Sequence, residues 1–358
     1  MTADAVGGVW TYATDLAAAL VAHDVTTTIA LLGPSPSAEQ RAAVGPIAGV
    51  ELLETGLPLD WLAGEDGSVR AAAGAIRALA RDLKADLIHL NSPVLAAGGA
   101  QDLPVIAAVH GCVATWWDAA HGDPLPARFA WHEAMMRDGL HAASAVVAPS
   151  HSYAVTVARR YGLSSVPYAI HNGRSPLPTV EAAPATGAFT AGRLWDRVKN
   201  TALLDAVAAR VPMRAAGPVT APHGETVRPE HLRLLGTLEV AGLARELAAR
   251  PVFVSAARFE PFGLAVLEAA QAGCPLVLAD IDTFRELWSD AAIFVRDEDD
   301  YVAAVEGLLA DRGEHARWGE RAQQRAARYT PVATASAMAA LYAGVLSDGA
   351  RSAKREAA

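Results

Sequence analysis

Short apolar runs alternate with stretches of helical periodicity along the first half of the chain. Residues 26–32 are rich in β-branched and apolar side chains and predict a buried strand. The stretch 68–84 predicts an amphipathic helix. Strands that alternate with helices are typical of a parallel, doubly wound sheet, which binds ligands at the carboxyl ends of its strands. Further strands are expected at 50–53, 86–90, 105–109, 146–148 and 167–170, and a further helix at 9–22.

The second half of the chain repeats this alternation. One strand is expected to end at Gly192. A helix is expected at 264–271, because its residues are mostly good helix formers. The second half therefore predicts a second sheet of the same kind. Its other elements are expected as strands at 213–216, 232–235, 275–279 and 292–295 and as helices at 301–309, 316–327 and 332–346.

A proline-rich stretch separates the two halves. Residues 174–186 hold three prolines, and we interpret this stretch as an interdomain linker. A chain of 358 residues is long enough for two domains of ordinary size. We therefore expect one domain over 1–173 and another over 187–331.

Composition and charge narrow the class of protein. Hydrophobic residues make up 52% of the chain, so it can bury a large core. The formal net charge of −9, from 30 basic and 39 acidic residues, argues against a nucleic-acid partner. Cys112 and Cys274 have apolar neighbours and no metal-ligand spacing, so we expect them in the core of a protein from a reducing compartment. No apolar run approaches the ~20 residues of a membrane span, so we expect a cytoplasmic protein whose membrane contact is at most peripheral.

Two carboxylates flank the start of the helix expected at 264–271. Glu260 and Glu268 lie eight positions apart, and Gly263 between them lets a ligand approach the backbone closely. The N–H groups at a helix start bind anions such as phosphate, and carboxylates on each side would accept hydrogen bonds from hydroxyl groups. This pattern describes a pocket for a nucleotide-sugar. The alternative is an ordinary helix with Glu260 near its cap and Glu268 facing solvent.

Two cations lie in the loop that follows the strand ending at Gly192. Arg193 and Lys199 precede a helix that is expected to start near Asn200. A guanidinium and an ammonium group in one strand-to-helix loop are suited to clamp a diphosphate. The alternative is that both are solvated surface cations.

Polar and small residues also follow the expected strands of the first half. Asn91, His110 and Ser150 each stand at a strand end, where a doubly wound sheet binds its ligands. Gly7 and Gly8 follow the first strand and let a ligand approach the backbone. This strand is very short, either because the sequence starts late or because the strand is a stub. A lone histidine or a glycine pair is more often structural, so these positions gain weight only from their context.

Trp116 and Trp117 are adjacent in a tract that also holds His121 and that we expect to be a polar loop. Aromatic faces in such a loop suit stacking on a sugar ring or on an apolar acceptor. A hydrophobic clamp over the sheet is at least as good an interpretation, and both stay open.

The motifs of the second half resemble one known family. The stretch from Glu260 to Glu268 reads Glu-Pro-Phe-Gly-Leu-Ala-Val-Leu-Glu and has Ala-Gly-Cys-Pro further on. It resembles the E-x7-E motif of family 4 retaining glycosyltransferases with the GT-B fold. Gly192-Arg193 with Lys199 resembles the Gly-Arg…Lys motif of the same family.

The first half resembles the family in the same order, so the resemblance covers nearly the whole chain. The glycine turn near the start looks like the amino-terminal loop beside the donor and acceptor sites. Val-His110-Gly resembles the strand-end histidine that contacts the donor sugar, and Asn-Gly at 172–173 resembles the end of the amino-terminal domain. The family then continues with an apolar residue and an Asp. This chain has Arg174 and Ser175 instead, which leaves the role of that Asp without a residue.

The resemblance implies the GT-B fold, an α/β architecture of two Rossmann-like, doubly wound domains facing a central cleft. The domain over 1–173 would hold the acceptor side, and the domain over 187–331 would bind the nucleotide-sugar. The helix at 332–346 would cross back to the first domain. The implied activity is that of a hexosyltransferase, which moves a sugar from a UDP- or GDP-linked donor to a carbohydrate or lipid-linked acceptor with retention of anomeric configuration.

The implied roles fall on residues already described. The diphosphate would be held by Arg193 and Lys199, and the ribose hydroxyls by Glu268. The donor sugar would be contacted by Glu260, by the backbone of Gly263 and Leu264, and by His110 near the reacting carbon.

No bound metal or cofactor is expected. No Asp-x-Asp tract stands at a strand end, and the two loop cations with the helix start at Gly263 can neutralise a leaving diphosphate. No carboxylate is an obvious nucleophile, so a same-face displacement fits better than a double displacement. Two alternatives stay open. One is a nucleotide-sugar epimerase or a phosphorylase on the same fold, and the other is a non-catalytic nucleotide-sugar-binding protein.

Overall fold

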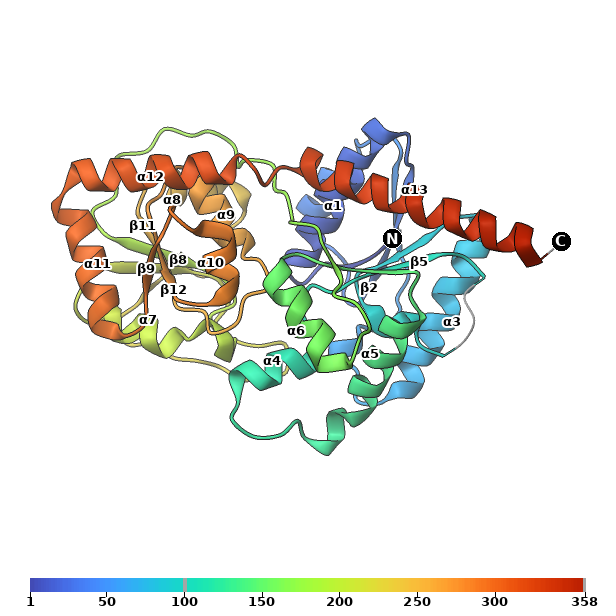
Figure 1. Cartoon of the computed structure of the whole chain (residues 1–358). Helices are drawn as coiled ribbons and strands as arrows, with labels where there is room; N and C mark the ends of the chain where they lie inside the picture. Colours follow the sequence, from blue (N-terminus) through green and yellow to red (C-terminus); the bar gives the residue numbers. More distant parts are fainter. Residues whose placement is uncertain (99–101, 357–358) are drawn as a thin grey trace. The chain divides into compact units, whose positions relative to one another are not determined.

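The computed structural model describes residues 1–98 and 102–356 and divides into two compact units (Figure 1). Unit 1 comprises Met1–Gly173 and the last helix, which begins at Pro331. Unit 2 comprises Arg174–Thr330. Within both units, all pairs of named strands run parallel. Parallel strands need crossover connections, and helices supply most of them here.

Unit 1 contains two parallel sheets, with the orders β1-β2-β3 and β4-β5-β6-β7. The sequence predicts one sheet here, and the structure breaks it between β1 and β4, which are adjacent without ladder bonds. The chain passes from β3 back across β1 to β4, so the strand order reverses there, and ligands of doubly wound sheets bind at such a point. The strands are β1 Thr2–Asp4, β2 Thr27–Leu32, β3 Val50–Glu54, β4 Ile88–Leu90, β5 Val105–Ala108, β6 Ala145–Ala148 and β7 Tyr168–Ala169.

The side chain of Asn91 bridges the break between the two sheets. Its amide Nδ2 donates to the backbone oxygen of Thr2 at 2.7 Å, and its backbone N–H donates to Thr2 Oγ1 at 3.0 Å. Backbone groups in a buried sheet must be paired, so this side chain replaces a ladder bond at the seam. Asn91 is therefore fixed at the carboxyl end of β4.

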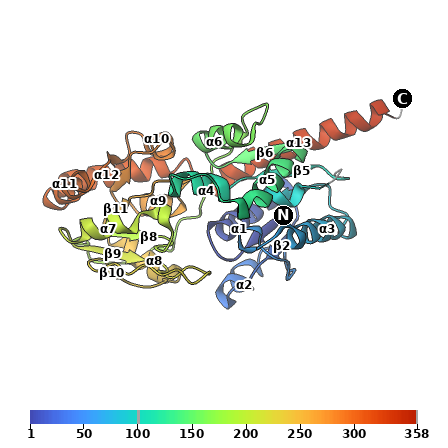
Figure 2. The ribbon, with the colours of Figure 1, turned by 90° about the horizontal axis from the view of Figure 1, so that it is seen from below.

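Helices cover the two sheets of unit 1. Leu16 and Leu20 of α1 and Met338 of α13 are buried in one cluster with Ile29 of β2, and α13 lies against α1 (Figure 1). Helix α6 packs beside β6 (Figure 2). The helices are α1 Gly8–Leu20, α2 Ala38–Val44, α3 Asp66–Asp82, α4 Val113–Ala120, α5 Ala130–Ala142, α6 His151–Tyr161 and α13 Pro331–Glu356.

The last part of the chain corrects the expectation that no apolar stretch approaches the length of a membrane span. Residues 312–349 contain a window of mean hydropathy 1.2 that is long and apolar enough, by length and composition alone, to cross a membrane. The core helix of a soluble protein, which is mostly buried, passes the same test, and 22% of this window is buried. Here Ala335, Met338 and Tyr342 on α13 are buried in the core cluster of unit 1. At least this face of the helix is therefore part of the fold.

Unit 2 contains one six-stranded parallel sheet with the order β10-β9-β8-β11-β12-β13. The chain builds β8, β9 and β10 outward in one direction and then crosses back to place β11 on the other side of β8. The strand order therefore reverses between β8 and β11. The strands are β8 Ala188–Ala191, β9 Met213–Ala216, β10 Arg233–Leu234, β11 Val252–Ser255, β12 Leu276–Ala279 and β13 Ile293–Val295.

Helices bury both faces of the sheet of unit 2, which explains why central strands such as β11 and β12 are mostly apolar and buried. Leu267 of α9 and Phe284 of α10 pack in one cluster with Phe253 of β11. Leu204 of α7 and Val305 of α11 pack in a second cluster. The helices are α7 Thr201–Ala208, α8 Val240–Ala248, α9 Leu264–Gln271, α10 Asp282–Trp288, α11 Glu298–Ala310 and α12 Arg312–Ala326.

We expect Gly139→Ala to destabilise the protein. Gly139 lies in α5, and a Cβ atom there would stand 1.9 Å from the backbone oxygen of Pro93, just after the seam residue Asn91. Overpacking against backbone costs about 1–3 kcal/mol, because the helix has to shift. The midpoint of thermal unfolding measures the effect.

Gly74→Ala is the matched control, because Gly74 lies inside α3 and a Cβ atom there would meet nothing within 4 Å. This variant should gain about 0.5–1 kcal/mol from helix propensity. Equal midpoints for the two variants would contradict the close contact between α5 and the segment at Pro93.

Candidate functional site

Two loops meet at the switch point of unit 2. One follows β8 and spans 192–200, and the other follows β11 and spans 256–263. Strands β8 and β11 are neighbours, so both loops leave the same edge of the sheet. The backbone N–H of Arg258 donates to the backbone oxygen of Val198 at 2.8 Å and ties the loops together. The predicted diphosphate residues and the predicted Glu260 are thus brought to one place.

A glycine allows a third loop to approach closely. Gly217 follows β9 with φ +133°, and a Cβ atom on it would stand 1.7 Å from the backbone oxygen of Gly192. No other residue type fits this contact without moving backbone. The loops after β8 and β9 therefore form one surface at the carboxyl edge of the sheet.

Each predicted loop cation has a carboxylate partner within unit 2. Arg193 is 42% exposed and pairs with the buried Asp196 at 3.1 Å. Asp196 also accepts the backbone N–H of Val198 at 3.3 Å. Lys199 Nζ of the first loop contacts the carboxylate of Glu260 in the second. The sequence predicts that these two cations clamp a diphosphate, and the structure shows each of them paired with a carboxylate at the loop junction.

Helix α9 begins at this junction. Gly263 precedes it with φ +96°, and no side chain caps it among the residues that the structure describes. Phe262 and Val266 are buried and anchor this turn in the core. The first N–H groups of α9, from Leu264 onward, lack carbonyl partners inside the helix and can bind an anion.

Glu268 lies one turn further along α9 and is only 12% exposed. Arg174 Nε donates to Glu268 Oε1 at 2.9 Å. The sequence did not predict this pair, and Arg174 was noted there only as a departure from the family pattern. The one sequence signal for a role of Arg174 is a cation next to the Asn-Gly at 172–173.

The segment expected as a linker is attached to unit 2 near both ends. The backbone N–H of Arg174 donates to the backbone oxygen of Tyr329 at 3.2 Å. Near the other end, the N–H of Ala185 donates to the oxygen of Ala249 at 2.7 Å. Residues 174–186 contain no helix or strand, as expected of a connecting segment, yet they belong to the fold of unit 2.

The predicted glycines and histidine of unit 1 lie at its switch point. Gly7 caps the start of α1 with extended backbone, and Gly8 is the first residue of that helix. His110 follows β5, and its Nε2 lies 2.9 Å from Asn91 Oδ1. The ring of Tyr12, from α1, lies 4.3 Å from that of His110 between centroids. Sequence reasoning noted Asn91 at a strand end but did not assign it to the site.

A hydrogen-bond chain fixes the tautomer of His110. Asn91 Nδ2 donates to Thr2, so Asn91 Oδ1 accepts, and His110 Nε2 carries the proton. His89 Nε2 also approaches Asn91 Oδ1, at 3.2 Å, and His89 Nδ1 lies 2.6 Å from the hydroxyl of Tyr342. Tyr342 comes from α13, so the last helix supports the switch point of unit 1.

Burial keeps His89 and His110, the two histidines of this hydrogen-bond network, neutral. It lowers the pKa of His110 to about 4. Burial, with a smaller contribution from the terminal ammonium group and from His110, lowers the pKa of His89 to about 3. A charged imidazole would lose its hydration without gaining a counter-ion. His110 is therefore a neutral hydrogen-bonding group near pH 7 rather than a cation.

The structure corrects the loop expected at Trp116 and Trp117. Both residues lie in α4, whose start is capped by the thiol of Cys112. Trp117 is buried, and its ring stacks on that of His121 at 3.8 Å between centroids. Its indole N–H donates to the backbone oxygen of Asp123 at 3.0 Å. These contacts satisfy Trp117 internally and agree with the alternative of a hydrophobic clamp.

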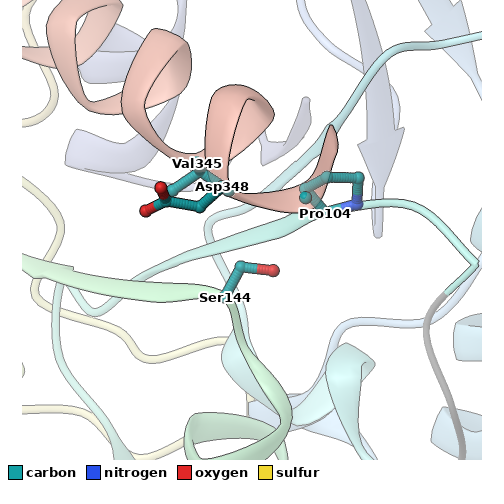
Figure 3. Close-up of a pocket in the computed structure, with 5 residues that line it drawn as sticks. Pro104, Ser144, Val345 and Asp348 are labelled. Carbon is teal, nitrogen blue, oxygen red and sulfur yellow. The ribbon is translucent and has the colours of Figure 1, made fainter. Parts of the chain in front are cut away.

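A hollow of about 290 Å³ lies at the opposite edge of unit 1 (Figure 3). Pro104 and Ser144 line it and precede β5 and β6, and Val345 and Asp348 line it from α13. It therefore lies at the amino ends of strands whose carboxyl ends carry His110 and Ser150.

No group of three or more His, Cys, Asp or Glu suited to a metal occurs in the described part of the chain.

Two family models match the chain, in chain order. The model described as Glycosyltransferase Family 4 matches residues 6–176, and the model described as Glycosyl transferases group 1 matches residues 227–325. The first contains the site residues of unit 1. The second contains the loop after β11 and helix α9.

Two curated relatives match part of the chain. Phosphatidyl-myo-inositol mannosyltransferase from Mycolicibacterium smegmatis is 34% identical over 104 residues, which is 28% of this chain and 27% of that protein. D-inositol 3-phosphate glycosyltransferase 2 from Catenulispora acidiphila is 31% identical over 121 residues, which is 33% of this chain and 28% of that protein. The chain thus aligns with less than a third of either relative.

Solved structures match nearly the whole chain. Sucrose-phosphate synthase from Thermosynechococcus elongatus has a TM-score of 0.73 at 17% identity, over 94% of this chain and 93% of that one. HepE from Anabaena in complex with UDP has a TM-score of 0.69 at 17% identity, over 96% and 99%. Both show the fold, and the prediction of two Rossmann-like domains of the GT-B class is confirmed.

The fold is that of the GT-B class, and both family models that match the chain are glycosyltransferase models. The two matches cover the two halves of the chain in the order expected of the resemblance to family 4.

We expect His89 and His110 to stay unprotonated in the folded protein down to pH 5. Their folded-state pKa values, about 3 and about 4, lie below the unfolded value of about 6.5. NMR titration of the labelled imidazoles measures this, with His89→Gln and His110→Gln for assignment. A titration midpoint near pH 6.5 for either ring would contradict the conclusion that burial keeps the two imidazoles neutral.

The same shifts set the sign of the pH dependence of stability. As pH falls below 6.5, the unfolded chain binds protons that the folded protein does not. The contribution of His89 is therefore fully present above pH 6.5 and falls by about 1.4 kcal/mol per pH unit as acidification proceeds towards the folded pKa.

Proposed function

We propose that the protein is a retaining glycosyltransferase that moves a sugar from a UDP- or GDP-linked donor to an acceptor hydroxyl. The contact between Lys199 and Glu260 carries this proposal, because it joins the loops after β8 and β11 at the switch point of unit 2. The two cations Arg193 and Lys199 lie there with the start of α9 and with the carboxylates of Glu260 and Glu268. Such a set matches the phosphates and hydroxyl groups of a nucleotide-sugar.

The diphosphate is proposed to bind at the start of α9. The N–H groups after Gly263 face the phosphate oxygens, and Arg193 and Lys199 add charge-assisted hydrogen bonds. Asp196 and Glu260 hold these two cations in position before the ligand arrives. Preorganised positive charge stabilises the diphosphate most when it leaves, because negative charge then accumulates on the bridging oxygen.

The chemistry proposed is a same-face displacement. The bond between the anomeric carbon and the diphosphate oxygen breaks, and a bond from that carbon to the acceptor oxygen forms on the same face. The acceptor proton passes to an oxygen of the departing diphosphate. His110 is neutral and its Nε2 proton is donated to Asn91, so its Nδ1 would accept a hydrogen bond from a sugar hydroxyl and the ring does not act as a cation.

No metal or other cofactor takes part in this scheme. The positive charge is supplied by Arg193, Lys199 and the start of α9, all within unit 2. The nucleotide-sugar is a substrate.

The acceptor is proposed to be a carbohydrate or a lipid-linked carbohydrate. The names of the two curated relatives point to inositol-containing acceptors for those proteins. Inositol, inositol phosphate and phosphatidylinositol are therefore the first acceptors to offer this chain. A membrane contact needed for the last of these would be peripheral.

Three alternatives are separable by simple assays. A phosphorylase would consume donor faster when inorganic phosphate is added. An epimerase would return a nucleotide-sugar of altered configuration without releasing nucleoside diphosphate. A binding protein would retain affinity for the donor without consuming it.

Donor turnover is expected to survive excess EDTA. The assay follows release of UDP or GDP from UDP-glucose and GDP-mannose in the presence of each acceptor, with and without chelator. Activity within about two-fold of the untreated enzyme is expected, because the diphosphate charge is met by side chains. Complete loss with EDTA, restored by Mg²⁺ or Mn²⁺, would overturn the metal-independent scheme.

Substitutions of Glu260 and Glu268 should affect different ligands. Glu268→Gln should weaken nucleoside diphosphate and donor alike by about ten-fold, because both ligands contain the ribose. Glu260→Gln should spare the nucleoside diphosphate and impair donor turnover, because the transferred sugar is present only in the donor. Calorimetric titration of each variant measures this. Equal losses in both variants would show that the pair acts as one site.

A further inference from the structure

Arg174 is clamped over one face of α9 by its backbone and its side chain. Its backbone oxygen accepts from Gln271 Nε2 at 2.7 Å, and its side-chain Nε donates to Glu268 Oε1 at 2.9 Å. Glu268 and Gln271 are three residues apart on α9, so they share a face of the helix. The N–H of Arg174 is bound to Tyr329, so both backbone groups of this residue are fixed.

The pair between Arg174 and Glu268 lies in a mostly buried setting. The side chains are 17% and 12% exposed. A partly desolvated ion pair with hydrogen-bond geometry holds both groups in one conformation more firmly than a solvated surface pair. The carboxylate of Glu268 is therefore oriented before any ligand arrives.

An oriented carboxylate suits one part of a nucleotide in particular. Ribose carries two neighbouring hydroxyl groups, which can donate to the two oxygens of one carboxylate. A carboxylate offers about four lone-pair directions, so a carboxylate that accepts from an arginine can also accept from hydroxyl groups. A side chain that is already ordered loses less conformational freedom when the ligand binds.

We propose that Arg174 is a positioning residue that holds Glu268 for the 2′- and 3′-hydroxyls of the nucleotide ribose. This inference rests on the proposed function, because it needs Glu268 to face the nucleotide. It gives Arg174 a part in selecting ribonucleotides over deoxynucleotides. The residue acts through Glu268 and needs no contact with the ligand.

The test compares two ligands that differ only at the ribose. UDP and 2′,3′-dideoxy-UDP are titrated by calorimetry into the wild-type protein and into Arg174→Ala, Arg174→Lys and Arg214→Ala. The corresponding guanosine pair is used if the wild type prefers GDP. Arg214→Ala is the matched control, because Arg214 pairs with Glu246 at the same 2.9 Å in unit 2, away from the two motif loops.

Arg174→Ala should lower affinity for UDP about ten-fold and change affinity for the dideoxy ligand less than two-fold. Arg174→Lys should fall between wild type and Ala, since an ammonium group keeps the charge without the planar geometry. Arg214→Ala should leave both affinities unchanged. In combination with Glu268→Gln, Arg174→Ala should add little further loss, because both act on one contact.

Three results would overturn the inference. Equal loss of affinity for both ligands in Arg174→Ala would mean that Arg174 only supports the fold. Unchanged affinity for UDP would mean that Glu268 needs no such support. Failure of the wild type to bind either UDP or GDP would overturn the proposed function itself, and this inference with it. Thermal unfolding midpoints of all variants show whether the fold is retained.

Discussion

The site of unit 2 depends on one electrostatic contact across the centre of its sheet. Lys199 and Glu260 belong to loops that are 61 residues apart in the chain and that leave neighbouring strands. Their contact brings opposite charges together where the strand order reverses, and the start of α9 follows directly. The surrounding loops are held by backbone contacts, such as that of Gly217 on Gly192, which leave little room for other arrangements.

Unit 1 repeats this design with hydrogen bonds in place of charges. Its strand order also reverses between two central strands, and a side chain amide closes the seam there. Asn91 thereby has two functions. It replaces a missing ladder bond to Thr2, and it fixes which nitrogen of His110 carries a proton. The stability of the sheet and the chemistry of the histidine thus share one residue.

The sequence predicted well whatever is encoded locally. Helix α9 falls on the expected residues, because good helix formers follow a glycine, and buried strands such as β2 and β9 follow apolar runs. It failed at Trp117, where a polar tract suggested a loop and tertiary packing made a helix. It also did not pair Arg174 with Glu268, which are 94 residues apart, or His89 with Tyr342, which are 253 apart. Such partners follow from topology rather than from local pattern.

The bond between His89 and Tyr342 has a consequence for the order of folding during synthesis. Unit 1 is discontinuous in the chain, and its last helix is made only after all of unit 2 has been made. A nascent chain can therefore complete unit 2 while the apolar side of α1 still lacks α13. Closing so long a loop is slow, and the unfinished surface is exposed meanwhile. Unit 2 can thus be complete during synthesis before unit 1 has gained its last helix.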